Sequence, residues 1–305
     1  MANEVSHGNN ADLKVASILN SFVHFLLADR SDIRSTVLQV SPPNDRGSLA
    51  VKIPQVLFDD IMAAPGESTA VNPTALGDGA ATVTAARQAL RYDMSDEFFL
   101  SGASVTPEML AQGIVDGYIR RAAALIGAVI NGFSDTAGTS GAALVVSDIY
   151  DAHFELQKNL LDGEPVSCVL TPKQFTDFQS SLRGEGGAMQ WVPATADMLG
   201  IKPMGYVGSW NGVDFYKNAQ LANDGTDDFG AMYARSAVAM AQFTVGAIRS
   251  LLPPNGFMDT ARDEQVVWVE KNRTSESGLT KYVGHAIAGV ILNEDARGVT
   301  IQTVD

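Results

Sequence analysis

The chain has 305 residues, of which 46% are hydrophobic and 18% are charged, as in an ordinary folded protein. Its formal net charge of −14 arises from 35 acidic and 21 basic residues, and no run of basic residues occurs. Proteins that bind DNA displace phosphate counterions with clustered Lys and Arg. The composition therefore excludes a protein that grips nucleic acid through a basic surface.

The single cysteine, and the lack of an apolar leader or membrane-spanning stretch in the sequence, indicate the cellular environment of the chain. Cys168 lies in a short apolar run, which predicts a buried, inert thiol, and it has no partner for an internal disulfide. Residues 1–14 are polar and lack the basic and apolar regions of a signal peptide. No uncharged apolar stretch reaches the roughly 18 residues of a membrane span. We therefore expect no membrane partner and no secretion.

The first predicted elements are a helix and a long hairpin. Residues 11–27 have the apolar spacing of a modest amphipathic helix. Residues 48–57 and 81–92 are typical of strands, and residues 64–80 between them have no apolar periodicity. The simplest structure is a hairpin whose tip projects and is ordered by contacts with other chains. The residues predicted to make these contacts are Pro65, Gly66, Val71, Pro73, Leu76 and Gly79.

The clearest helix of the sequence follows the hairpin. Thr106 is suited to the N-cap and Pro107 to the first helical position. Apolar residues then recur at helical spacing from Leu110 to Phe133. A helix from Pro107 to Asn131 would be roughly 37 Å long. Gly113 and Gly117 in this helix predict close packing against another backbone.

Shorter elements follow along the chain. We expect a helix over residues 147–161 capped by Ser147, a buried strand over residues 166–170, and a helix over residues 172–182 capped by Thr171. Short strands are expected further on, with turns at Gly208-Ser-Trp and Asn211-Gly212. The chain should end in a hairpin over about residues 263–293 that turns at residues 274–278. No repeat or linker separates independent domains.

The order of these elements resembles the major capsid proteins of tailed double-stranded DNA phages, the Hong Kong 97-like fold also seen in encapsulin shells. Two segments contribute to the resemblance. Val169-Leu170-Thr171-Pro172-Lys173-Gln174-Phe175 looks like the family's strand-then-helix entry into the axial domain, and Asp93-Met94-Ser95-Asp96-Glu97-Phe98, before the long helix, is of a kind common in the family. The resemblance implies an α+β phage major capsid fold with five parts. These are an N-terminal arm (1–46), an extended E-loop hairpin (47–100), a long spine helix with the first part of a peripheral (P) domain (101–165), an axial (A) domain (166–262), and the returning sheet of the peripheral domain (263–305).

The same resemblance implies a function. It predicts a major capsid protein that self-assembles through pentamers and hexamers into the icosahedral head shell around the phage genome. The alternative of an encapsulin-type compartment shell stays open. The implied partners are copies of the chain itself, a portal protein, and packaged DNA without sequence-specific binding. Only 46 residues precede the hairpin, so we also expect a separately encoded scaffolding protein. The expected location is the virion, after synthesis in the cytoplasm of a host bacterium.

Catalytic and metal-binding patterns give little support to an enzyme. The phosphate-binding, zinc-binding and nucleophile-elbow motifs are missing from the sequence. The acidic segment Asn223–Asp228 has the residues to bind calcium but lacks EF-hand spacing, so a solvated turn is predicted. His153 is interpreted as a core or interface histidine, and Lys52 as a solvated lysine on a strand. We expect no catalytic residue, cofactor or metal ligand, and a simple binding module would leave the hairpin unexplained.

Overall fold

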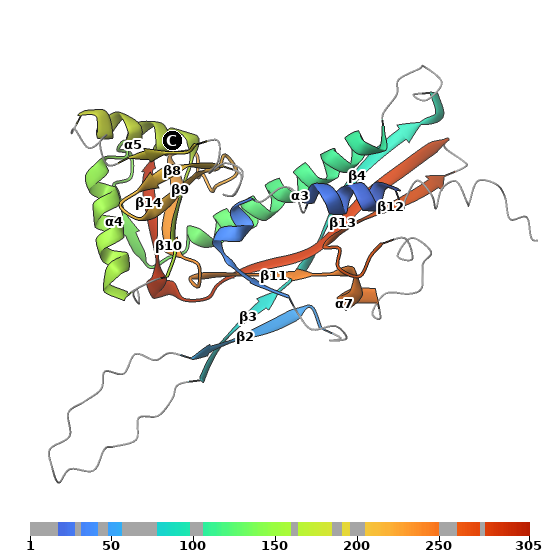
Figure 1. Cartoon of the computed structure of the whole chain (residues 1–305), viewed down its shortest axis with the longest axis horizontal. Helices are drawn as coiled ribbons and strands as arrows, with labels where there is room; N and C mark the ends of the chain where they lie inside the picture. The colour runs from blue at the N-terminus through green and yellow to red at the C-terminus, as the bar shows by residue number, and fades with distance from the viewer. Residues whose placement is uncertain are drawn as a thin grey trace, which may run out of the picture.

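A computed structural model of the chain is shown in Figure 1, coloured from the N-terminus to the C-terminus. The predicted helix over residues 11–27 is observed over residues 18–27, and its first part lies outside the described residues. Two sheets of different size and a separate hairpin make up most of the molecule. The residues that the structure describes are 18–27, 32–41, 48–56, 78–97, 106–159, 164–184, 191–195, 205–249, 261–274 and 278–305.

A five-stranded sheet is built around one long central strand. This strand, β13, pairs antiparallel with β4, β12 and β11, and β1 lies parallel to β11. The β12–β13 pair confirms the hairpin predicted near the end of the chain. A short helix, α7 (Val245–Arg249), follows β11, and a 3-10 turn, η1 (Ile33–Thr36), precedes β1. The strands of the sheet are β1 (Leu38–Val40), β4 (Ala86–Ser95), β11 (Val238–Phe243), β12 (Val267–Thr274) and β13 (Leu279–Leu292).

The long helix α3 (Pro107–Ile130) crosses one face of this sheet, as Figure 1 shows. Its N-cap is Thr106, whose side chain accepts a hydrogen bond from the Met109 N–H, and proline occupies the first turn. Both features were predicted, and they are confirmed. The helix buries one stripe of apolar side chains, including Ile114 and Ile126, in the core that it shares with the sheet.

Gly113 and Gly117 of α3 allow close packing, but the partners differ from the expected ones. A Cβ on Gly113 would lie 2.9 Å from the Tyr92 hydroxyl, and a Cβ on Gly117 would lie 2.6 Å from Cδ2 of Leu90. The neighbours are therefore side chains of β4, and the prediction of contact with another backbone is wrong. Large side chains on the strand fill the space that the glycines leave.

A seven-stranded sheet forms the second body, with strand order β5-β14-β10-β6-β9-β8-β7. Helices α4 (Val146–Asn159) and α5 (Pro172–Gly184) pack on one face around a core of their own, which includes Phe178 and Trp210. The predicted buried strand is β6, in which every residue is buried. The strands are β5 (Asp135–Ala137), β6 (Val166–Leu170), β7 (Val192–Pro193), β8 (Tyr206–Trp210), β9 (Val213–Lys217), β10 (Asp227–Ala234) and β14 (Gly298–Val304).

Several local predictions in this body are corrected. Ser147 lies inside α4, which begins one residue earlier, and the Val145 N–H instead donates to the Asp148 carboxylate. Gly208 lies within β8 and does not form a turn. The second predicted turn is confirmed, because Asn211 and Gly212 join β8 to β9 with φ angles of 50° and 82°. These left-handed angles at both positions fit a two-residue hairpin turn.

The division of the chain between the two sheets differs from the expected one. Strand β14 was expected with the terminal hairpin, but it pairs along its whole length with β10 in the seven-stranded sheet. Strand β11 was expected with residues 166–262, but it pairs with β13. Helix α4 was expected with the spine, yet it packs in the core of the seven-stranded sheet. Apolar alternation shows that a strand is half-buried without identifying its partner, so the sequence could not separate these cases.

The predicted hairpin is present, with a shorter second strand. β2 (Ala50–Val56) pairs with β3 (Asp78–Thr84), and the pair projects away from the body in Figure 1. The single strand expected over residues 81–92 is in fact two strands, because the chain leaves the hairpin at Ala85 and joins the five-stranded sheet as β4.

The two sheets are connected by a polar cluster, which we call the junction (Glu164, Ser236, Asn293 and Arg297). Nη1 of Arg297 lies 3.0 Å from Oε2 of Glu164 and 3.0 Å from the Ser236 hydroxyl. The Ser236 carbonyl accepts from the Asn293 side chain at 2.9 Å, and the Ser236 N–H donates to Glu164 at 2.9 Å. Arg297 belongs to a 3-10 turn, η4 (Asp295–Arg297), that leads from β13 to β14.

Candidate functional site

The root of the β2–β3 hairpin has one apolar face and one polar face. Val51, Ile53 and Val83 are buried, whereas Lys52 between them is exposed, as predicted. Alternate residues of a strand point to opposite faces, so the hairpin is a ribbon with one face on the core. The partners of this apolar face lie on the five-stranded sheet and α7: Phe243, Val245, Ile248, Trp268 and Ile287.

A glycine of the sheet sets how closely the root approaches. A Cβ on Gly289 would lie 2.5 Å from the Thr84 carbonyl oxygen and 2.9 Å from Cα of Ala85. Both neighbours are backbone atoms, which cannot rotate away as a side chain can. Ala85 is also held by a hydrogen bond of 2.9 Å from its N–H to the Leu49 carbonyl. Sequence reasoning did not identify Gly289, because nothing near it marks a backbone contact.

The structure describes only one of the six residues predicted at the tip of the hairpin. Pro65, Gly66, Val71, Pro73 and Leu76 lie outside the described residues. Gly79 lies on β3, opposite Gln55 of β2, and is exposed. The structure therefore defines the anchored base of the hairpin, and the contacts of the tip stay a prediction.

Beside the root, a buried histidine joins three strands. Nδ1 of His285 on β13 lies 3.0 Å from Nη2 of Arg87 on β4, and its Nε2 lies 3.2 Å from the Glu270 carboxylate on β12. The ring is 3% exposed and lies 5.6 Å from the ring of Trp268. Burial lowers the pKa of His285, and Arg87 lowers it further, while Glu270 acts in the opposite direction.

A small cavity lies between α3 and the sheet, close to these residues. Its volume is about 220 Å³, below the usual size of a ligand pocket. Arg121 of α3 donates a hydrogen bond of 2.8 Å to the Gln88 side chain at this site. The geometry does not resemble a substrate site. The cavity is lined by Gln88, Ala89, Leu90, Ile114, Gly117, Tyr118, Arg121, Val267, Gly284, His285 and Ala286.

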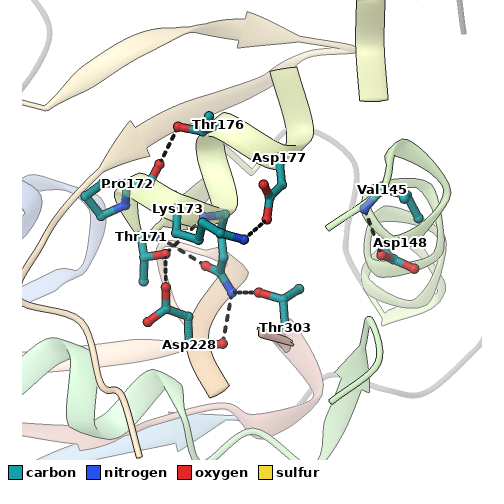
Figure 2. Close-up of polar contacts among 10 residues, drawn as sticks. Val145, Asp148, Thr171, Pro172, Lys173, Thr176, Asp177, Asp228 and Thr303 are labelled. Carbon is teal, nitrogen blue, oxygen red and sulfur yellow. Dashed lines mark hydrogen bonds and ion pairs between the residues drawn. The ribbon is translucent and has the colours of Figure 1, made fainter. Parts of the chain in front are cut away.

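The seven-stranded body is fixed by a buried polar network at the start of α5. Thr171 and Gln174 form a capping box, in which the Thr171 hydroxyl accepts from the Gln174 N–H and the Gln174 side chain accepts from the Thr171 N–H. The predicted Thr171 cap is thus confirmed. The Thr171 hydroxyl also donates to the Asp228 carboxylate at 2.6 Å. Figure 2 shows Thr171, Asp228 and Thr303 converging on this helix start.

The Gln174 side chain connects α5 to two strands. Its amide nitrogen lies 3.0 Å from the Asp228 carbonyl, 3.1 Å from the Ile301 carbonyl and 2.9 Å from the Thr303 hydroxyl. Gln174 is fully buried, and a Cβ on Gly230 would come within 2.5 Å of its side-chain oxygen. Glycine at that position leaves the space that the amide occupies. The network therefore joins β10, β14 and α5 in one rigid unit.

The acidic segment 223–228 is a structural turn, and the prediction of a solvated turn is wrong for its last two residues. Asp227 and Asp228 are buried. Asp227 accepts hydrogen bonds from the Ser140 hydroxyl, the Gly141 N–H and the Gln302 side chain, which lower its pKa in that order. The carboxylates are used to join strands, and no group of three or more possible metal ligands occurs within the described residues.

The environments of the remaining candidate residues do not make them reactive. The Cys168 thiol is buried, as predicted, and burial raises its pKa, which suppresses thiolate chemistry. His153 is partly buried on α4, and burial lowers its pKa. Exposed aromatic side chains on α4, Tyr150 and Phe154, were not singled out from the sequence. Across the described part of the chain, none of the helices is both long and apolar enough to cross a bilayer.

Comparison with known proteins identifies the type of fold. No family model and no curated protein sequence matches the chain. Among solved structures, the capsid of Ralstonia phage GP4 has a TM-score of 0.59 at 10% identity, covering 90% of this chain and 91% of that one. The structure titled Mycobacterium phage Che8 has a TM-score of 0.55 at 16% identity, covering 84% and 85%. A virus-like particle from Pyrococcus furiosus has a TM-score of 0.57 at 7% identity, covering 93% and 97%.

The mixed helix and strand architecture is therefore a capsid shell fold. More specifically, it is the Hong Kong 97-like fold of the major capsid proteins of tailed phages. The resemblance seen in the order of the predicted elements is confirmed at the level of the fold.

Proposed function

We propose that the protein is a major capsid protein of a tailed phage, which assembles with copies of itself into the shell of the head. The observation that carries this proposal is the projecting β2–β3 hairpin, anchored at its root, in a fold that phage capsid proteins share over most of the chain. An isolated two-stranded hairpin is marginally stable in water. A second chain that covers the outer face of this hairpin would stabilise it and would connect two subunits.

In this proposal each part of the fold has a place in the shell. The hairpin is the E-loop, α3 is the spine, the five-stranded sheet is the peripheral domain, and the seven-stranded body is the axial domain. Contacts that repeat by rotation close into pentamers and hexamers. Each contact is weak by itself, and the closed shell is stable because every subunit makes several of them at once.

The charge of the chain is consistent with a container for DNA. A net charge of −14 disfavours tight binding of a polyanion, so packaged DNA would be enclosed without being held at specific sites. A scaffolding protein, a portal protein and the packaged genome are the further partners in this proposal. The virus-like particle from Pyrococcus furiosus matches with a similar TM-score, so the contents of the particle distinguish a phage head from an encapsulin-type compartment.

The proposal is tested by electron microscopy and light scattering of the purified full-length protein. We expect rings or closed shells of uniform size, and a variant that lacks residues 66–79 should keep its circular dichroism spectrum but fail to form stable particles. Exposed Gln157 on α4 offers a control, since Gln157→Ala should assemble like the unmodified chain. A compact monomer under all assembly conditions would contradict the shell function, and normal particles from the deletion variant would contradict the role of the hairpin.

A further inference from the structure

The strand that leaves the hairpin is held by a side chain close to the point of departure. The chain passes from β3 to β4 at Ala85, and Arg87, two residues later, contacts His285. His285 pairs in register with Ala89 of β4, so the contact ties the first residues of β4 to the middle of the sheet. Arg87 itself is exposed, whereas His285 is buried.

The contacts favour one protonation state of the ring. Nε of Arg87 donates to Nδ1 of His285 at 3.3 Å, and Nη2 lies 3.0 Å from Nδ1 and 3.4 Å from Nε2. Arginine has donors and no acceptor, so the two shorter contacts favour an unprotonated Nδ1 that accepts from Arg87. The one ring proton is then on Nε2 and is donated to Glu270 at 3.2 Å. The imidazole is therefore neutral between a cation and an anion. A second proton on Nδ1 would remove the acceptor and place a positive charge on the buried ring, 3.0 Å from Nη2 of Arg87.

We propose that Arg87, His285 and Glu270, here called the His285 cluster, are a proton-sensitive connection that holds the hairpin root to the sheet at neutral pH and releases it on acidification. Because Arg87 is exposed, it can turn into water, whereas the ring cannot leave its site. Loss of this contact removes one of the ties on the start of β4 and, through Ala85, loosens the last residues of β3, while Val51, Ile53 and Val83 stay in the apolar cluster under the root. The hairpin then changes its angle to the body. This inference concerns the subunit itself and does not depend on its assembly.

Most of the other charged groups near the cluster have partners of their own. Alternate residues of β4 share a face, and on the face of Arg87 the next charged residues, Arg91 and Asp93, pair with each other. On β13 the same face carries Lys281, two pairs further along. On the face of the sheet where α3 packs, Arg121 is hydrogen-bonded to Gln88. On the side of α7, Arg249 pairs with Asp263 at 3.1 Å.

The direction of the pH effect follows from burial and charge. Burial and Arg87 lower the pKa of His285 below the ordinary value of about 6.5, and Glu270 limits the decrease. The unfolded chain therefore takes up the proton before the folded one does. The stability supplied by neutral His285 is fully present above about pH 6.5 and is lost as the pH falls from there to the lowered value.

Hydrogen–deuterium exchange of the full-length unassembled subunit tests the proposal, at about pH 7.5 and about pH 5, on either side of the ordinary histidine pKa, with times scaled for the intrinsic rate. We expect protection of the amides around Ala85 to fall about tenfold or more at the lower pH. His285→Gln keeps one acceptor and one donor but does not titrate, so its protection should not change. The matched control His153→Gln should behave like the unmodified chain.

A second measurement keeps the test decisive if His285→Gln does not fold. In an NMR titration of the ring, Arg87→Gln should raise the apparent pKa of His285, because a neighbouring cation is removed. Protection that is unchanged in the unmodified chain, or that falls equally in His285→Gln, overturns the proposal. So does an NMR titration in which Arg87→Gln leaves the pKa of His285 unchanged.

Discussion

Replacing Gln174 by leucine should destabilise the seven-stranded body strongly. Gln174 is fully buried, and its side chain serves the Thr171 N–H, the Asp228 and Ile301 carbonyls and the Thr303 hydroxyl. Leucine has a similar volume but no polar atom, so these groups lose a partner while water stays excluded. A buried group left unpaired costs about 1–3 kcal/mol. If only two of them stay unpaired, the free energy of unfolding falls by about 2–6 kcal/mol.

Urea unfolding of the unassembled subunit, followed by circular dichroism, measures this loss as a lower midpoint at an unchanged slope. The same substitution at exposed Gln157 on α4 is the control, and its effect should stay within about 0.5 kcal/mol. If the free energy of unfolding of Gln174→Leu lies within about 1 kcal/mol of that of the unmodified chain, the network relaxes at little cost and the reasoning fails.

Two further predictions concern the hairpin root and the acidic turn. Gly289→Ala places a Cβ against the backbone of Thr84 and Ala85, and should cost about 1–3 kcal/mol and increase exchange of the β3 amides. Gly184→Ala, with no atom within 4 Å of the new Cβ, should be near neutral, and equal effects at both sites would contradict the close approach. The pKa of Asp227 is lowered in the folded chain, so its stabilisation is present above the unfolded value of about 3.9 and is lost as the pH falls through the lowered value. Asp227→Asn should therefore flatten stability against pH below about pH 4, and an unchanged acid limb would refute the assignment.

The long helix and the order of the elements along the chain could be predicted because the sequence signals for each element are local. Thr106 and Pro107 mark the helix start within one turn, and Asn211-Gly212 marks a two-residue turn whatever surrounds it. Such features depend on backbone preferences of a few adjacent residues. The same is true of the Thr171 cap, which needs only Gln174 three residues later.

The places where prediction failed depend on residues distant in sequence. The break at Ala85 has no glycine or proline to announce it, because it arises from the exchange of β2 for β13 as the pairing partner. In the sequence Gly289 is an ordinary small residue, and its role follows only from the contact of the hairpin root with it in the structure. Likewise, Arg87 and His285 are 198 positions apart, and only the register of β4 on β13 brings them together.

The junction has a mechanical consequence. The two sheets are joined by α3, by the loop around Ser236 and by the segment that carries Arg297, and a single hydrogen-bonded cluster ties the last two of these together. A body held at several points resists bending and torsion far more than one joined by a single strand. In the proposed shell, rings of five and of six subunits would meet their neighbours at different angles, and the middle of the subunit would be the stiff part. Differences in curvature would then be absorbed at the hairpin root and by sliding between chains.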